Sequence, residues 1–146
     1  MEYKLLLASD GSENALRAAE FAARMVSLAP AIKVTVIVVN DILEKMKYYS
    51  PLRSPIVIEE VDAFFKEKTK EDLDATMEVF EKNGVKATGL TKIGNPARDI
   101  VNYAHAEGIK HIVIGSRGMG SLKGIVLGSV SSKVVQLADC PVTIVK

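Results

Sequence analysis

Short apolar runs alternate with longer amphipathic stretches along the chain. Leu5 to Ala8 and Val34 to Val39 are continuous apolar runs, which are typical of strands covered on both faces. Between them, Ser12 is placed to cap a helix whose apolar residues recur at the spacing of one buried face: Ala15, Ala18, Ala19, Ala22, Ala23 and Val26. This pattern predicts a strand, a helix and a second strand.

The alternation continues to the C-terminus. Asn83 and Gly84 end the longest amphipathic stretch, and Asn95 with Pro96 forms a helix start in which proline occupies the first turn. The further predicted elements are a helix over 60–82, a strand over 85–93, a helix from Pro96 to near Gly108, a strand over 109–114, a helix over 129–138 and a strand over 142–145.

Residues 41–59 interrupt this rhythm. Tyr48-Tyr49-Ser50-Pro51 and Ser54-Pro55 combine turn-forming residues with two prolines. Because proline is disfavoured inside a helix, we expect an irregular connection here.

Five strands with intervening helices predict right-handed crossovers and a mostly parallel sheet in an α/β fold. A length of 146 residues suits one domain, so we expect residues 1–146 to form a single unit. The net charge is +1, and lysine and arginine are spread along the chain. The sequence therefore does not favour a nucleic-acid partner.

Cys140 is the only cysteine, which excludes a disulfide within the chain. It opens an apolar strand without a neighbouring histidine or basic run, so we expect a structural thiol. The first residues resemble neither a signal peptide nor a membrane span. We therefore expect a cytoplasmic protein without membrane contact.

The loops that follow the strands are the places to search for a ligand site, because α/β sheets bind ligands at the carboxyl ends of their strands. After the first strand comes Asp10-Gly11-Ser12, and after the second Asn40-Asp41. The loop after the fourth strand runs Gly115-x2-Gly118-x9-Gly128-Ser129. Glycines allow backbone amides to approach an anion, and the helix that starts at Ser129 would add the positive end of its dipole.

This loop matches neither of the two common phosphate motifs. The chain lacks the G-x-x-x-x-G-K-[ST] sequence of a P-loop, and the dinucleotide fingerprint belongs after the first strand. Taken alone, the glycine-rich segment is as consistent with a surface turn as with a phosphate site.

With its neighbours, however, the segment resembles the phosphate-binding pattern of the universal stress proteins of the ATP-binding type. Five segments resemble that family in the right order: Leu7 to Ser12, Val36 to Val39, Gly94 to Ala97, Gly128 to Ser131 and Cys140 to Val142. One position departs from it, because Val38 stands where relatives often carry histidine. The resemblance implies a Rossmann-like three-layer sandwich of the adenine nucleotide alpha hydrolase-like type. Its five-stranded parallel sheet would have the order 3-2-1-4-5.

The resemblance also implies roles for individual residues. Asp10 would lie beside the ribose and phosphates, directly or through a divalent ion such as Mg²⁺, and Val39 would contact adenine. Gly115 and Gly118 would line the sugar and phosphates, and Gly128 and Ser129 would hold the terminal phosphates. The expected ATP site comprises Ser9, Asp10, Val39, Gly115, Ser116, Arg117, Gly118, Gly128, Ser129 and Val130. Members of the family commonly form homodimers through the last strand, here 142–145.

Catalytic machinery is sparse in the sequence. His105 and His111 lack metal-spaced partners, and no G-x-S-x-G motif occurs. The leading hypothesis is an ATP-binding dimeric module that regulates a stress response through an unknown protein partner. One alternative is an enzyme, a slow ATP hydrolase or an adenylyl-transferring protein, with Asp10 as its key residue. The other is an interaction module whose glycine loop binds nothing.

Overall fold

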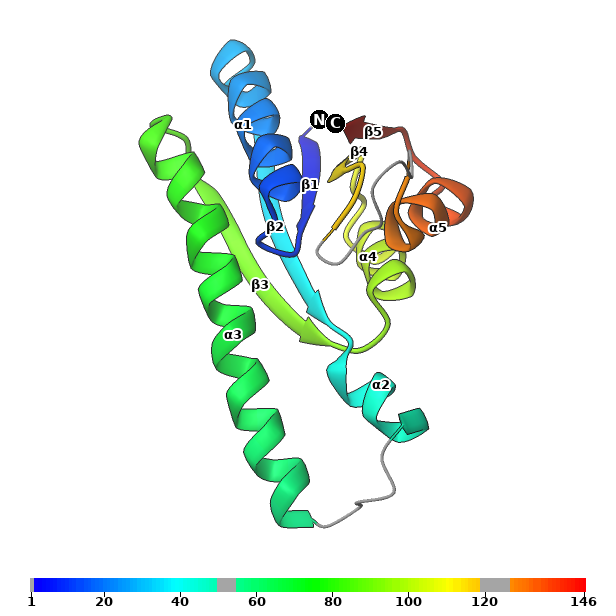
Figure 1. The fold of residues 1–146 in the computed structure, drawn as a ribbon. Helices are drawn as coiled ribbons and strands as arrows, with labels where there is room; N and C mark the ends of the chain where they lie inside the picture. Colours follow the sequence, from blue (N-terminus) through cyan, green and yellow to red (C-terminus); the bar gives the residue numbers. More distant parts are fainter. Residues whose placement is uncertain (1, 50–54, 119–126) are drawn as a thin grey trace.

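Five parallel strands form the centre of the molecule, in the order β3-β2-β1-β4-β5 (Figure 1). This computed structural model describes residues 2–49, 55–118 and 127–146. The strands are β1 (Tyr3–Ser9), β2 (Ile32–Asn40), β3 (Ala87–Ile93), β4 (His111–Gly115) and β5 (Val142–Val145). The predicted strand order and parallel pairing are confirmed.

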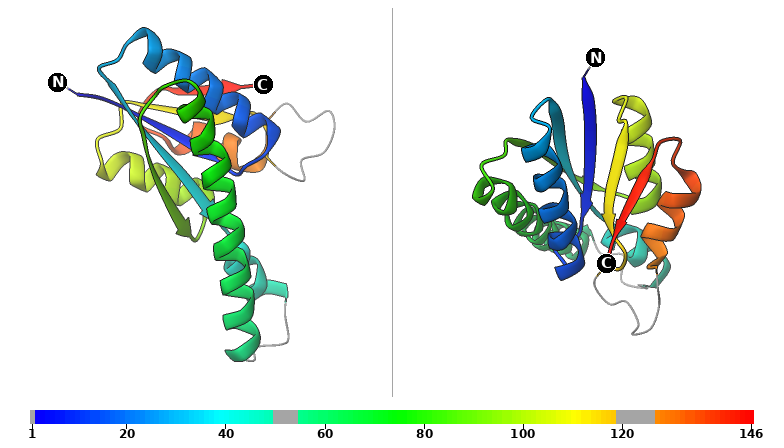
Figure 2. Two further views of the ribbon diagram at one scale, coloured as in Figure 1. Left: turned by 90° about the vertical axis from the view of Figure 1, so that its left-hand side faces the viewer. Right: turned by 90° about the horizontal axis from the view of Figure 1, so that it is seen from above.

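Helices cover both faces of the sheet, so the molecule has three layers (Figure 2). One face carries α1 (Glu13–Leu28) and α3 (Pro55–Lys82), and the other carries α4 (Pro96–Ala106) and α5 (Ser129–Leu137). In the central strand, Leu5 and Leu7 pack under α1 and α3, whereas Leu6 packs under α4 and α5. All three leucines are fully buried, which explains the continuous apolar run.

The helix starts follow the predicted capping pattern. Ser12 Oγ accepts a hydrogen bond from the Ala15 amide at 3.2 Å, and Asn95 Oδ1 accepts one from the Arg98 amide at 3.0 Å. Pro96 occupies the first turn of α4, where a missing N–H group costs little. These caps fix where the chain leaves β1 and β3.

The expectation of an irregular connection over 41–59 is wrong for 42–49 and 55–59, which are helical, and residues 50–54 lie outside the described residues. Ile42–Tyr49 forms the helix α2, and α3 begins at Pro55. No glycine or proline interrupts residues 42–49, and Asn40 Oδ1 accepts a hydrogen bond from the Ile42 amide at 2.9 Å. Pro55 is the first residue of α3, where its missing amide leaves no bond unmade.

Other boundaries differ by a few residues from those predicted. β3 begins at Ala87 and β4 at His111, each two residues later than expected. These small shifts leave the order of the elements unchanged.

The helix α3 reaches beyond the sheet. Its 28 residues span about 42 Å at 1.5 Å per residue, compared with about 30 Å for the nine residues of β2. The overhanging N-terminal part of α3 and the short helix α2 form an arm that projects from the body (Figures 1 and 2). Within the described residues, no helix has the length and apolar composition that a membrane span requires.

Candidate functional site

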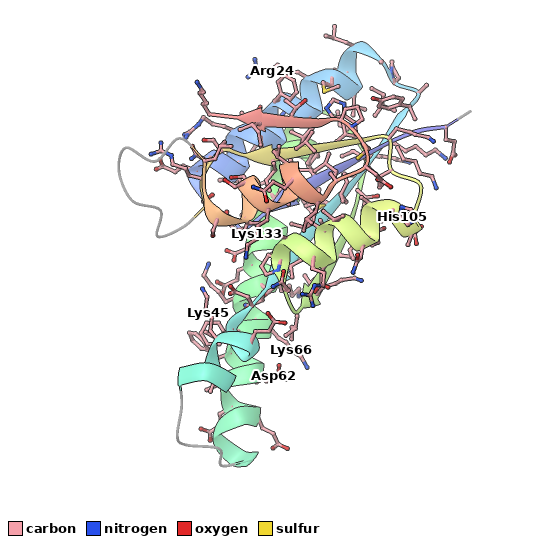
Figure 3. All side chains as sticks on the ribbon, turned by 90° about the vertical axis from the view of Figure 1, so that its right-hand side faces the viewer. Arg24, Lys45, Asp62, Lys66, His105 and Lys133 are labelled. Carbon is pink, nitrogen blue, oxygen red and sulfur yellow. The ribbon has the colours of Figure 1, made fainter. Side chains whose placement is uncertain are left out.

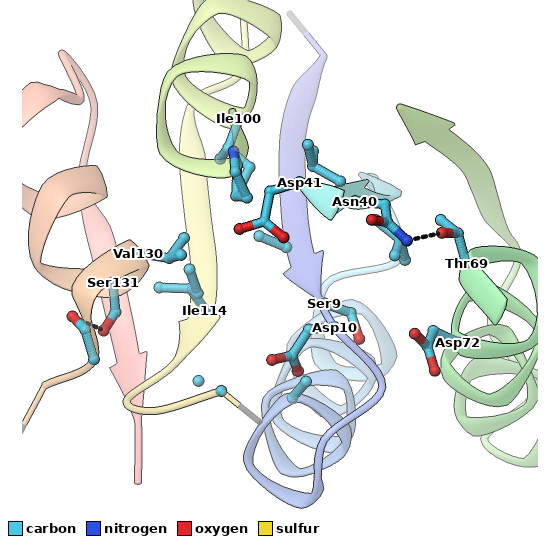
Figure 4. A pocket seen from close by; sticks show the side chains of 18 of the residues that line it. Ser9, Asp10, Asn40, Asp41, Thr69, Asp72, Ile100, Ile114, Val130 and Ser131 are labelled. Atoms are coloured by element: carbon cyan, nitrogen blue, oxygen red, sulfur yellow. Dashed lines mark hydrogen bonds between the residues drawn. The ribbon is translucent and has the colours of Figure 1, made fainter. Parts of the chain in front are cut away.

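A pocket of about 440 Å³ opens at the carboxyl ends of β1, β2 and β4 (Figure 4). Ser9 and Asp10 lie at its centre, where β1 ends. The side of β4 and α5 contributes Ile114, Gly115, Arg117, Gly118, Gly128, Ser129, Val130 and Ser131. The opposite side is formed by Val39, Asn40, Asp41, Ile42 and Lys45 from β2 and α2, with Phe65, Lys68, Thr69 and Asp72 from α3.

Asp10 and Gly118 are in close contact within this pocket. The Asp10 Oδ1 atom accepts a hydrogen bond from the Ser12 amide at 3.0 Å. A Cβ atom at position 118 would lie 2.3 Å from Asp10 Oδ2. A side chain at this position would therefore displace the carboxylate.

Glycine is needed at position 115 for a different reason. A Cβ atom there would lie 2.9 Å from the carbonyl carbon of Asn14, in the first turn of α1. Because this neighbour is backbone, it has little freedom to move away. Gly115 therefore allows α1 to pack closely against the end of β4.

The start of α5 is joined to the end of β4 by Ser116. The Ser116 carbonyl accepts hydrogen bonds from the Gly128 amide at 2.7 Å and from Ser131 Oγ at 2.8 Å. Gly128 is the N-cap, and none of the described side chains caps this helix. Amide groups at the start of α5 thus adjoin a pocket wall formed by Ser129 and Val130, an arrangement suited to an anion.

Two side-chain hydrogen bonds attach α3 to the ends of β1 and β2. Ser9 Oγ lies 2.7 Å from Thr76 Oγ1, and Asn40 Nδ2 donates to Thr69 Oγ1 at 2.7 Å. Thr69 and Thr76 are almost fully buried. These bonds position α3 as one wall of the site.

Two ion pairs line the pocket. Lys68 Nζ lies 2.6 Å from Asp72 Oδ1, and this hydrogen bond raises the pKa of Lys68 above its ordinary value. Lys45 Nζ lies 3.3 Å from Asp41 Oδ2. Within the described part of the chain, no group of three or more potential metal-ligating side chains occurs.

Comparison with known proteins identifies the family. The model of the universal stress protein family matches residues 2–146. The chain belongs to the universal stress protein family. Universal stress protein YxiE of Bacillus subtilis is 36% identical over 148 residues, with 98% of each chain covered.

Solved structures agree with this assignment. MJ0577 from Methanocaldococcus jannaschii has a TM-score of 0.82 and 30% identity, covering 100% of this chain and 96% of its own. A universal stress protein from Archaeoglobus fulgidus, solved in complex with dAMP, has a TM-score of 0.70 and 25% identity, with 100% of both chains covered.

In this universal stress protein, the pocket brings together all but one of the residues predicted for the site. Those that line it are Ser9, Asp10, Val39, Gly115, Arg117, Gly118, Gly128, Ser129 and Val130. Ser116 is not among the described lining residues, because its side chain is buried and its backbone joins β4 to α5. Ligand binding by these residues stays a prediction.

The contribution of α3 was missed from the sequence. Residues Phe65, Thr69, Asp72 and Thr76 recur at helical spacing and continue to the buried Phe80. Polar side chains on an otherwise apolar face are unusual unless they have partners. This interruption of the buried face was the available signal.

The remaining titratable candidates lie elsewhere. His105 lies on α4 (Figure 3), and its Nδ1 atom is 2.7 Å from Asp139 Oδ2, a contact that lowers the pKa of Asp139. His111 Nε2 lies 2.6 Å from Thr143 Oγ1, and burial lowers the pKa of His111. Burial also raises the pKa of the half-buried Cys140 thiol, in keeping with a structural role.

Proposed function

We propose that this chain is an ATP-binding member of its family, a dimeric module whose nucleotide state regulates a stress response. The pocket at the strand ends carries this proposal, because it combines a helix start suited to an anion with an apolar cavity in one site. The dAMP complex of the Archaeoglobus fulgidus relative supports an adenine nucleotide as the ligand.

The phosphates are assigned to the side formed by Gly118, Gly128 and Ser129. Here the start of α5 supplies backbone donors, and the Ser129 hydroxyl adds a further donor. The apolar side chains of Val39, Ile100 and Val130 line the cavity. A planar base with a polar edge suits a cavity of this composition.

Asp10 fits the role of a Mg²⁺ contact. Mg²⁺ in nucleotide sites is held by one or two carboxylates together with phosphate oxygens and water. Asp10 supplies a carboxylate beside the glycine loop. Bound Mg²⁺ would offset the charge of the phosphates.

The dimer is proposed to form through β5, which is an edge strand of the sheet. Edge strands present unpaired backbone groups, and pairing two copies would remove both edges.

Ser129→Asp tests the phosphate assignment. An acidic residue in the first helical turn stabilises a helix by about 0.3–1 kcal/mol, so the free protein should remain folded. The same carboxylate would repel a phosphate, and ATP affinity should fall at least about tenfold by isothermal titration calorimetry.

Ser132→Asp is the matched control, because Ser132 lies on the same helix outside the described pocket lining. This variant should bind Mg-ATP much like the native protein. Equal affinity of the Ser129→Asp variant and the native protein would contradict the assignment.

A further inference from the structure

The helix α3 carries an ion pair that faces the pocket. Lys68 Nζ is 2.6 Å from Asp72 Oδ1, and both residues line the cavity. The Lys68 side chain is 43% exposed and the Asp72 side chain 17% exposed, so both can be reached by a ligand. An ammonium group has three N–H donors and a carboxylate two acceptor oxygens, so one mutual bond leaves further capacity on each.

Asp72 lies next to the turn that leads out of β1. A Cβ atom on Gly11 would meet Asp72 Oδ1 at 2.5 Å, and Gly11 follows Asp10 directly. On the other side of Asp10, its Oδ2 atom adjoins Gly118. Asp10 therefore lies between Gly118 and the ion pair on α3 (Figure 4).

This arrangement distinguishes two ends of the pocket. The end at α5 offers backbone N–H groups, which suit a phosphate. The end at α3 offers a cation and an anion that neutralise each other, together with the ring of Phe65. Such a pair matches an uncharged polar group with donors and acceptors better than it matches a phosphate.

We propose that Lys68 and Asp72 recognise the nucleoside half of the ligand, by hydrogen bonds to sugar hydroxyls or to a base edge. The inference rests on the proposed nucleotide binding and adds a recognition element outside the glycine loop. Under this assignment, α3 determines which nucleoside is accepted, whereas the glycine loop and α5 hold the phosphates.

The test measures the affinities of ATP, ADP and AMP for Lys68→Met and Asp72→Asn variants by isothermal titration calorimetry. A hydrogen bond to a charged group typically corresponds to about a tenfold change in affinity. Each variant should therefore bind about tenfold more weakly, and by the same factor for all three nucleotides.

A second ion pair on the same helix supplies the control. Lys66 Nζ lies 2.9 Å from Asp62 Oδ2, also four residues apart, and neither residue is among the described pocket lining (Figure 3). Lys66→Met and Asp62→Asn should leave all three affinities unchanged. Melting temperatures of the free variants establish that each is folded.

Several outcomes would overturn the inference. A loss that shrinks from ATP to AMP would place Lys68 on the phosphates. Opposite effects of Lys68→Met and Asp72→Asn would indicate only a long-range charge effect, and unchanged affinities would show that the pair does not touch the ligand. If the native protein binds none of the nucleotides, the proposed function itself fails and this inference fails with it.

Discussion

At the scale of single residues, two glycines shape the pocket because they have no side chain. Gly118 leaves room for the Asp10 carboxylate, and Gly11 adopts φ +76° beside Asp72. A positive φ and a close neighbour both favour glycine at position 11. Glycine at these two positions therefore leaves space for the carboxylates of Asp72 and Asp10.

The half-buried His111 provides a prediction at the same scale. Burial lowers the pKa of His111 below its ordinary value of 6.5. As pH falls below that value, the unfolded chain takes up a proton that the folded chain resists, so stability decreases. In His111→Gln, the free energy of unfolding should fall less between pH of about 7.5 and about 5.5 than in the native protein.

Urea unfolding at both pH values measures this difference. Identical pH dependence in the native protein and the His111→Gln variant would contradict the assigned cause.

At the scale of elements, α3 connects the arm to the site. Thr69 and Thr76 contact the strand ends. The N-terminal turns of α3 lie in the arm together with α2 (Figure 1). The Thr76 hydroxyl contacts Ser9 Oγ and donates to the Asp72 carbonyl at 2.8 Å. The position of Asp72 in the pocket therefore depends on buried bonds of the same helix.

Thr76→Val tests the contribution of these bonds to stability. Valine keeps the shape of threonine but removes the hydroxyl, so the free energy of unfolding should fall by about 1–2 kcal/mol. Thr91→Val, at an exposed position of β3, should change it much less. Chemical denaturation of both variants measures the effect, and equal stabilities would show that the buried bond contributes nothing.

The elements differ in how far the sequence could predict them. Continuous apolar runs and the Ser12 and Asn95 caps are local signals, and the strands and helices that depend on them were predicted. The helix α2 was not, because Pro51 and Pro55 outweighed the proline-free stretch 42–49, before which Asn40 Oδ1 accepts a hydrogen bond from the Ile42 amide. The Lys68–Asp72 pair was missed because these two residues are far from β1 in the sequence and approach its end only in the folded chain.

At the scale of the whole molecule, the family fold brings separate loops to one edge of the sheet. Loops after β1, β2 and β4 were predicted to meet there, since parallel strands end at the same edge. β5 and β3 are the two edge strands of the sheet. One end of the molecule thus carries the pocket, and one edge is available for assembly.

The proposed dimer leads to a prediction for β5. The Ile112 amide donates to the Pro141 carbonyl and the Ser116 amide to the Val145 carbonyl. The alternation of a strand then directs the amide of Ile144 away from β4. Ile144→Pro should therefore spare the sheet but block pairing with a second copy.

Light scattering after size exclusion should find a monomer for Ile144→Pro and a dimer for the native protein. Ile144→Ala, which loses a similar side chain but keeps the amide, should remain dimeric. A monomeric native protein, or a dimer in all three cases, would contradict assembly through β5.

The most direct test of nucleotide binding is the melting temperature of the native protein as a function of Mg-ATP concentration, with Mg²⁺ alone as reference. A ligand at one hundred times its Kd stabilises the folded state by about 2.7 kcal/mol. The proposed function predicts a melting temperature that rises with Mg-ATP and not with Mg²⁺ alone. A melting temperature that stays constant up to millimolar Mg-ATP would contradict nucleotide binding at this pocket.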